Sequence, residues 1–302
     1  MIKKRSEILF CYDVTNANPN GDPMDENKPR IDEETGRNIV TDVRLKRTIR
    51  DYLFEYKGFN GKDGKDIFVR EILMEENDPE KGIQDGKERA KDFSNDYRRI
   101  IDMCIDIRLF GGVIPLEKDS ITFTGPVQFK MGQSLHAVEI KHIKGTGAFA
   151  SKAGTKQKTF REEYILPYSF ICFHGIINET AAKHTGLSEE DVKLLLEAMW
   201  NGTKNLISRS KFGHMPRFLL KVDYKEESSG FFIGDLDKFI KLTGFEVEER
   251  IRSINDFELD ISKLVNVFNK NKEKIEAIYY LKDENLRIKD NIIPEEWKKL
   301  EF

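Results

Sequence analysis

Three windows of the sequence gather basic side chains with at most one acid in each. Residues 41–50 contain four Lys or Arg and one acid, residues 120–161 contain seven and one, and residues 198–222 contain five and none. Lys and Arg neutralise phosphate groups whatever bases accompany them. A polyanion is therefore the first ligand to consider, although each window alone is also compatible with an ordinary solvated face.

The charge of the whole chain argues in the opposite direction. The 302 residues carry 50 Lys and Arg against 53 Asp and Glu, a formal net charge of −3, whereas nucleic-acid-binding domains are usually basic. The acids concentrate in residues 22–34, 71–96 and 231–302. A chain with charges segregated in this way can attract a polyanion to one face while its total charge stays near neutral.

The sequence offers no motif for catalysis or for a metal. None of the five His residues pairs with another His at HxxxH spacing or with a Cys, and both GxSxG and the phosphate-binding GxxxxGK[ST] loop are absent. Asp13, at the end of a predicted strand, is a candidate general base or metal-binding acid, but a lone carboxylate more often caps a loop. We therefore predict no catalytic residue, no bound metal and no cofactor.

Two further stretches are candidates for binding. Asn16, Asn18 and Asn20 lie in a long predicted loop, where they either hydrogen-bond sugar and phosphate oxygens or cap turns. Residues 145–160 combine Gly, positive charge and the aromatic Phe149. Such a segment is suited to lie across an RNA strand and wedge between its bases, or else it is a surface loop without fixed structure.

The elements that position these residues follow from apolar patterning. Compact apolar runs predict strands, and apolar residues at helical spacing behind the N-capping residues Thr41 and Ser188 predict two helices. The predicted strands are 6–14, 102–109, 120–131 (or a broken hairpin), 164–177 and 217–224, and the predicted helices are 41–56 and 188–206. This order indicates an α+β fold with the ferredoxin-like βαββαβ pattern, which is also that of the RNA-recognition motif.

The rest of the chain is expected to surround this pattern within a single domain, 1–302. Residues 57–100 predict an irregular, partly helical insertion, and residues 133–163 predict an exposed basic excursion. Residues 231–302 predict a mostly helical C-terminal extension.

Cysteine usage and hydropathy indicate where the protein works. Cys11, Cys104 and Cys172 form neither a CxxC pair nor an even disulfide framework, which favours a reducing, cytoplasmic location. The N-terminus is too short and too polar for a signal peptide. No run of about 18 apolar residues occurs, so we expect no membrane span and no membrane partner.

Several stretches resemble the backbone subunit of type I CRISPR Cascade effectors, most closely that of subtype I-B. A long block that leads into the basic helix carries most of the resemblance, and three shorter stretches follow in family order up to about residue 224. The matching stretches are 16–23 (NANPNGDP), 35–37 (TGR), 40–50 (VTDVRLKRTIR), 106–112 (DIRLFGG), 125–129 (GPVQF) and 208–213 (SRSKFG).

The resemblance implies a RAMP-superfamily fold, with an RNA-recognition-motif-like palm, a helical insertion (57–100) and a thumb hairpin (133–163). It also implies that several copies polymerise along one CRISPR RNA, beside other Cascade subunits, and present the spacer for pairing with target DNA. Subunits of this kind do not cleave nucleic acid. The alternative is a RAMP-type endoribonuclease, because related type III backbone proteins cut target RNA with a loop aspartate, for which Asp13, Asp22 and Asp25 are the candidates here.

The same resemblance assigns RNA contacts to three groups of residues. The loop and the basic helix would hold the backbone of the guide RNA. The thumb would fold over the RNA with Phe149 as the wedge, and the loop before the last strand would also contact the RNA. The predicted RNA-binding residues are Asn18, Asn20, Thr41, Arg44, Lys46, Arg47 and Arg50; Lys141, Lys144, Phe149 and Lys152; and Arg209, Ser210 and Lys211.

Overall fold

A mixed sheet forms the centre of the computed structural model, which describes residues 1–75, 78–117, 119–150 and 158–302. Strand β1 (Ser6–Ala17) lies between β11 (Lys158–Ile177) and β12 (Met215–Tyr224), and both neighbours run antiparallel to it. The full order is β16-β15-β12-β1-β11-β9-β5-β4, with β8 and β10 also paired to β11. The outer strands are β15 (Ile275–Lys282), β16 (Lys298–Lys299), β9 (Gly132–Ala137), β8 (Val127–Phe129), β5 (Arg37–Val40) and β4 (Ile31–Asp32).

Strand β1 is buried on both faces, which explains why its sequence is a continuous apolar run. Phe10 and Tyr12 pack into one hydrophobic core, whereas Leu9 and Cys11 pack into another on the opposite face. The predicted strands 6–14, 164–177 and 217–224 all fall within β1, β11 and β12.

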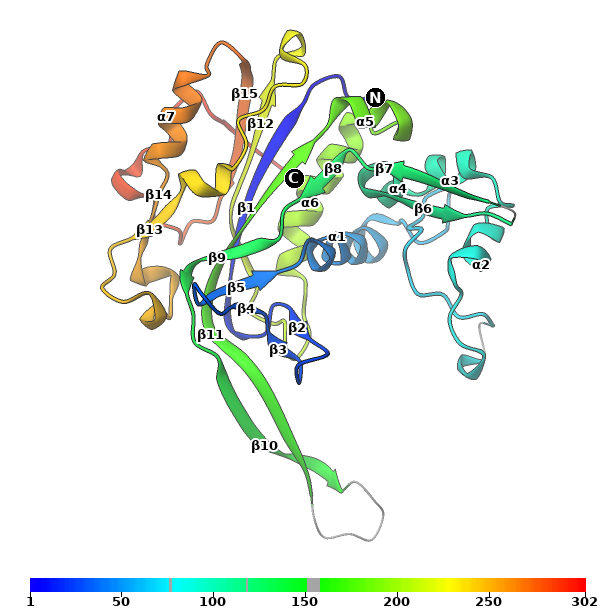
Figure 1. The fold of residues 1–302 in the computed structure, drawn as a ribbon, viewed down its shortest axis with the longest axis horizontal. Coiled ribbons are helices and arrows are strands. Elements are labelled where there is room, and N and C mark those ends of the chain that lie inside the picture. Colours follow the sequence, from blue (N-terminus) through cyan, green and yellow to red (C-terminus); the bar gives the residue numbers. More distant parts are fainter. Residues whose placement is uncertain (76–77, 118, 151–157) are drawn as a thin grey trace.

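Two long helices cover the first face of the sheet (Figure 1). Helix α1 (Asp42–Lys57) begins at the N-cap Thr41 and ends at Gly58, which has the left-handed backbone that suits glycine. Helix α6 (Glu189–Lys204) begins with a capping box at Ser188. A Cβ atom at Gly202 would lie 3.0 Å from the Cβ of Tyr52, so a small residue lets the two helices approach closely. The structure confirms an α+β architecture.

The other face of the sheet is covered by residues 231–302, and here the prediction of a mostly helical extension is wrong (Figure 1). The α-helix of this region is α7 (Ser262–Lys270), followed by a turn and strand β15. Residues 275–282 (IEAIYYLK) contain two Ile and two Tyr, residue types that favour strands, and β12 supplies the ladder that holds this strand. The remaining elements are β13 (Lys241–Thr243), β14 (Glu258–Asp260) and short 3₁₀ turns at Glu226–Ser228, Leu236–Phe239, Glu248–Arg250, Ile254–Asp256 and Lys289–Asn291.

An insertion between α1 and β8 forms a lobe with its own small core, built around Phe93, Cys104 and Ile107. Its elements are α2 (Gly86–Lys91), α3 (Tyr97–Met103), α4 (Ile105–Phe110), β6 (Gly111–Pro115), β7 (Ser120–Thr124) and the turn Pro79–Lys81; a further helix, α5 (Glu179–Thr185), follows β11. The predicted strand 102–109 is wrong, because this stretch spans the end of α3 and most of α4. Helix α4 lies between two cores and is apolar on several sides, so its short run resembles a buried strand.

The predicted strand or broken hairpin at 120–131 is divided into β7 and β8 at Gly125 and Pro126. A Cβ atom at Gly125 would overlap the backbone of Phe110, so glycine permits the close crossing of these two segments.

A long hairpin of β10 (Lys141–Ala150) and the first part of β11 projects from the body (Figure 1). The ladder runs from Lys141 opposite Ile165 to Thr146 opposite Phe160. Strand β11 continues into the central sheet, so the same strand belongs to the hairpin and to the body. Lys152 lies outside the described residues, and Phe149 is placed only through the backbone of β10.

No helix within the described residues is long and apolar enough to cross a membrane.

Candidate nucleic-acid interface

The start of helix α1 is positioned by the loop that precedes it, which contains β2 (Gly21–Asp22) and β3 (Lys28–Pro29). Asn20 Oδ1 accepts hydrogen bonds from the backbone N–H (2.8 Å) and the hydroxyl (2.9 Å) of Thr41. Thr41 Oγ1 in turn accepts one from the N–H of Arg44 at 3.3 Å. The structure therefore gives Asn20 and Thr41 a positioning role, because their polar side-chain atoms orient the first turn of the helix.

Arg44 extends from this first turn and forms no ion pair with a carboxylate of the residues that the structure describes. One guanidinium nitrogen donates to Thr48 Oγ1 at 3.0 Å, while Nε is buried and has no hydrogen-bond partner in the described structure. Burial lowers the pKa of Arg44, which shows that the surroundings disfavour its charge. The guanidinium remains charged at neutral pH, because arginine has the highest pKa of the side chains.

Lys211 lies near this guanidinium on the turn that precedes β12. Its Nζ donates to the backbone oxygen of Asn18. Burial, followed by repulsion from Arg44, lowers the pKa of Lys211 to about 8. Burial also lowers the pKa of His214, which is 3% exposed, to about 3, with smaller contributions from Lys211 and Arg44, so the ring is neutral.

Arg44, Lys211 and His214 together form what we call the basic centre. Neither cation of the basic centre forms an ion pair in the part of the chain that the structure describes. Half-buried charges without a counter-ion are costly, and a phosphate that entered would supply the missing negative charge. The basic centre is thus suited to an anion that arrives from solvent.

The turn that carries Lys211 is held firmly against the body. The N–H of Asn18 donates to the backbone oxygen of Ser210 at 2.9 Å, and the buried Asn18 side chain donates to the oxygen of Asn27 at 2.7 Å. Arg209 reaches Glu163 of β11 at 2.6 Å. Of the predicted RNA-binding residues, the structure therefore brings Asn18, Ser210 and Lys211 together with Arg44, and it adds Arg209 at the base of the hairpin.

The other bases of α1 are already paired. Lys46 Nζ donates to Asp42 at 2.9 Å and to Gln128 at 3.3 Å. Arg47 is half-exposed and contacts Asp51 at 2.7 Å. Arg47 therefore remains accessible to a second anion, whereas Lys46 joins the helix to Gln128 of β8.

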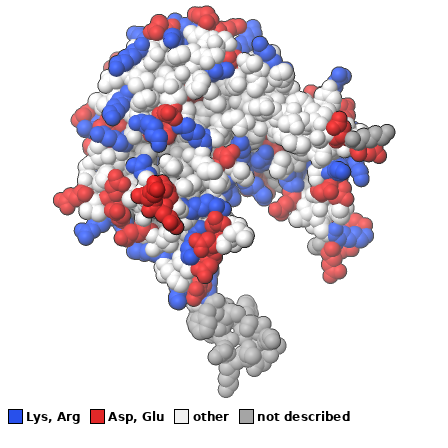
Figure 2. All heavy atoms as spheres, viewed as in Figure 1, with Lys and Arg blue, Asp and Glu red and all other residues white. Residues whose placement is uncertain are grey.

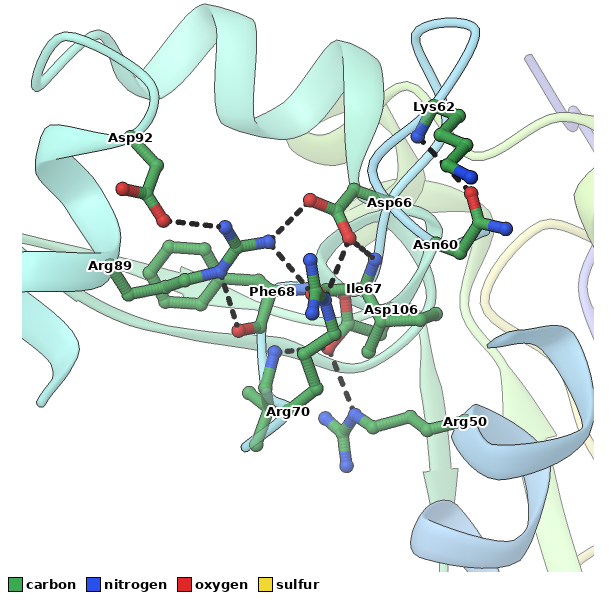
Figure 3. A network of polar contacts seen from close by, with 11 residues as sticks. Arg50, Asn60, Lys62, Asp66, Ile67, Phe68, Arg70, Arg89, Asp92 and Asp106 are labelled. Atoms are coloured by element: carbon green, nitrogen blue, oxygen red, sulfur yellow. Dashed lines mark hydrogen bonds and ion pairs between the residues drawn. The ribbon is translucent and has the colours of Figure 1, made fainter. Parts of the chain in front are cut away.

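Arg50 ties helix α1 to the insertion (Figure 3). Its Nε donates to the fully buried Asp106 at 2.9 Å, and Asp106 also accepts the backbone N–H groups of Phe68 (2.8 Å) and Val69 (3.1 Å). Close by, Asp66 accepts from Arg89 in the same network. Arg50 therefore compensates a buried carboxylate, and its structural role is evident from these contacts.

The hairpin carries more exposed charge. Lys141 is exposed, and Lys144 is exposed and lies 3.4 Å from Glu162 on the facing strand. Tyr164, at the base, donates to Glu26 of the long loop at 2.9 Å. The two hairpin lysines thus lie on the projecting hairpin rather than at the basic centre.

The surface is hollowed between the insertion and the remainder of the molecule (Figure 2). Lys and Arg side chains gather at the top of this hollow, whereas both signs mix on the hairpin. A cavity of about 280 Å³ between α1 and the insertion is lined by three arginines (Arg47, Arg50, Arg70) and three acids (Asp51, Glu55, Glu71), so the formal charges of its lining balance.

The three aspartates weighed as nuclease candidates all have basic partners. Asp13 is buried, accepts from the hydroxyl of Tyr168 at 2.8 Å and lies 2.9 Å from Arg217 Nε. Burial raises the pKa of Asp13, and Arg217 opposes this shift only in part. Asp22 pairs with Arg30 at 2.6 Å and Asp25 with Lys28 at 2.7 Å.

A cluster of possible metal ligands was not visible in the sequence. His174, Asp235 and Asp237 place ligand atoms within 4.8 Å of one another, although about 60 residues separate the histidine from the acids. The ammonium of Lys130 lies against both carboxylates, so the cluster already holds a cation. His214 was also missed, because its burial beside Lys211 depends on tertiary packing that no local pattern reports.

Comparison with known proteins gives a consistent result. Residues 4–262 match the family model described as "CRISPR-associated protein Cas7". A protein of that name from Haloferax volcanii is 31% identical over 310 aligned positions, which cover 94% of this chain and 88% of the relative. Two solved chains, from a "CRISPR RNA-guided surveillance complex, pre-nicking" and a "CRISPR RNA-guided surveillance complex", share the fold.

These two structures match with TM-scores of 0.55 and 0.56 at 12% identity. Both comparisons cover 99% of this chain, and they cover 96% and 95% of the solved chains. The family match extends over most of the chain and includes the loop, the basic helix, the hairpin and the turn at Lys211. The chain therefore belongs to the Cas7 family of CRISPR-associated proteins.

Proposed function

We propose that this protein is a non-catalytic backbone subunit of a type I CRISPR surveillance complex, of subtype I-B, and that it binds CRISPR RNA. The observation that carries the proposal is the basic centre, in which neither Arg44 nor Lys211 forms an ion pair with an acid that the structure describes. Membership of the Cas7 family and the fold shared with chains of surveillance complexes support the same function.

The contacts would be to the RNA backbone. A phosphate at the basic centre can take charge-assisted hydrogen bonds from Arg44 and from Lys211, neither of which depends on the base attached. Arg47 and Arg209 are placed to neutralise neighbouring phosphates. Recognition of this kind leaves the base edges free, so that the guide itself specifies the target DNA by pairing.

The palm of the proposed subunit is the ferredoxin-like part of the sheet. Strand order β12-β1-β11-β9, with α1 and α6 on one face, supports this assignment. We assign the whole chain to one domain in which 57–100 form the insertion, 133–163 the thumb and 231–302 the C-terminal extension. In the thumb, Lys141 and Lys144 would hold RNA together with Phe149 and Lys152.

Several copies would follow one another along the RNA, together with other subunits of the complex, in the cytoplasm. The near-neutral total charge supports such stacking, because acidic surface on one copy can meet basic surface on the next. The paired states of Asp13, Asp22 and Asp25 support a subunit that does not cleave RNA.

Substitution at the basic centre tests the proposal. Lys211→Met keeps the length of the side chain and removes its charge, whereas Lys263→Met removes an exposed charge of α7 on the other side of the sheet. We expect Lys211→Met to weaken binding of single-stranded guide RNA for every sequence and to reduce the slope of log affinity against log salt by about 1.

The control Lys263→Met should leave both affinity and slope unchanged. Fluorescence anisotropy with labelled RNA at several salt concentrations measures both quantities. If Lys211→Met binds RNA with the affinity and slope of the unmodified protein, the basic centre is not the RNA site.

A further inference from the structure

The turn that carries Lys211 also presents two large apolar side chains to solvent. Ile207 is 68% exposed and Phe212 is 70% exposed. Single exposed apolar residues are common on protein surfaces, so their meaning depends on what surrounds them. Here both occur within one short segment, and Phe212 directly follows the lysine of the basic centre.

The backbone around Phe212 is fixed on both sides. The N–H groups of Lys211 and Phe212 both donate to the oxygen of Ser208, at 3.2 and 2.9 Å. Gly213 has a φ of 98°, and a Cβ atom there would lie 3.2 Å from the backbone oxygen of Thr15. The turn therefore lies close against β1, and it presents the Phe212 ring from a pre-organised support, which lowers the entropic cost of binding.

The surroundings of Phe212 select the chemistry of its partner. Arg209, in the same turn, is paired with Glu163, whereas Lys211 and Arg44 form no ion pair with any residue that the structure describes. A simple anion would use the charges but not the ring, and a purely apolar partner would leave the charges unpaired. Single-stranded nucleic acid offers both features within one repeating unit, because each nucleotide joins a phosphate to a flat aromatic base.

We infer that Phe212 is a base-stacking residue, which receives the face of a nucleobase whose backbone phosphate binds at Lys211 and Arg44. The inference rests on the proposed function. It adds a contact between the protein and a nucleobase to the proposed contacts with the RNA phosphates. Lys211 and Phe212 are consecutive residues of one turn, and their Cα atoms are about 3.8 Å apart. A nucleotide at this turn would meet a phosphate-binding ammonium and an exposed ring that start from neighbouring backbone positions. Stacking is insensitive to base identity, since every base has a π face.

Two probes of equal length distinguish a contact with the base from a contact with the phosphate. The first is a single-stranded RNA of about six nucleotides, within the usual range of single-strand sites, and the second is an abasic ribose-phosphate oligomer. We expect Phe212→Ala to weaken binding of the RNA by about 5- to 100-fold, the usual effect of removing one stacking platform. The same variant should bind the abasic oligomer as tightly as the unmodified protein does.

Matched variants complete the test. Phe212→Trp should restore RNA binding, because it keeps a flat aromatic face, and Phe302→Ala, which removes another exposed ring, should bind both probes normally. Lys211→Met should weaken both probes, because it removes the phosphate contact.

The outcomes distinguish the inference from the proposed function. If Lys211→Met weakens both probes but Phe212→Ala weakens neither, the stacking role is wrong and the RNA site stands. If neither variant changes either probe, the RNA site itself is refuted. If Phe212→Ala leaves the affinity for the short RNA unchanged and reduces the mass of particles assembled on long RNA, the ring contacts a second protein copy and the inference is overturned.

Discussion

Removing the charge of Lys211 should stabilise the RNA-free protein while it damages RNA binding. Burial lowers the pKa of Lys211 from 10.5 to about 8. Each unit corresponds to about 1.36 kcal/mol, so at pH 7 the charged ammonium costs the folded state at most about 3 kcal/mol. Lys211→Met removes this cost and also the hydrogen bond to the oxygen of Asn18, worth about 1 kcal/mol. Because the side chain is partly exposed, we expect a net gain of about 1–2 kcal/mol.

The pH dependence identifies the cause of this gain. The unfolded chain binds a proton on Lys211 up to about pH 10.5, whereas the folded chain releases it near pH 8. Stability of the unmodified protein therefore rises with pH between these two values, and by about pH 9.5 the contribution has grown by about 2 kcal/mol. The advantage of Lys211→Met should be present at pH 7 and largely absent at pH 9.5.

Urea unfolding of protein stripped of RNA, followed by fluorescence at both pH values, measures the difference. Lys263→Met serves as the control, because it removes an exposed lysine from α7, on the other side of the sheet from the basic centre. A Lys211→Met variant that is less stable than the unmodified protein at pH 7, or whose advantage is the same at pH 9.5, would contradict the account of the basic centre as an uncompensated charge.

Three further outcomes follow from the contacts described above. Arg50→Met leaves the buried Asp106 without its cation, so it should lower the free energy of unfolding by about 3–5 kcal/mol and expose the insertion to limited proteolysis. An unchanged stability would show instead that the two N–H donors alone compensate Asp106. Asp13→Asn should leave labelled RNA as intact as the unmodified protein does, because Asp13 is buried and paired with Arg217; RNA cleavage that disappears in the variant would establish the nuclease alternative. RNA affinity should fall above pH 8 as Lys211 loses its proton, towards the affinity of Lys211→Met, and that variant should lack this pH dependence.

Much of the central architecture is predictable from local sequence. Helix α1 combines an N-cap at Thr41 with an apolar stripe, and β1 is a compact apolar run, so both elements follow from periodicity and capping. The errors arise where tertiary context decides. Helix α4 is short and is enclosed by two cores, and its polar residues Asp106 and Arg108 meet partners elsewhere in the fold. Strand β15 depends on pairing with β12, which local charge patterns do not report.

The site was predictable as a set of basic windows but not in its detail. Arg44 and Arg50 lie on the same helix and are indistinguishable by residue type. Arg50 nevertheless pairs with Asp106, 56 residues along the chain, whereas Arg44 donates to the hydroxyl of Thr48 and pairs with none of the described acids. Whether a base is compensated depends on partners brought together by folding. The sequence shows the number of positive charges, and the fold determines which of them remain available.

Strand β11 has a mechanical consequence. Its 20 residues would span about 65 Å if fully extended, and they run without a break from the hairpin into the centre of the sheet. A force on the hairpin end of β11 acts along the strand and shears its ladder with β1, in which several hydrogen bonds resist it together. Bending of the hairpin should therefore displace Tyr12 of β1, which packs against His214 with ring centroids 5.7 Å apart. Strand β11 thus connects the binding partner of the hairpin to β1, which packs against His214 of the basic centre.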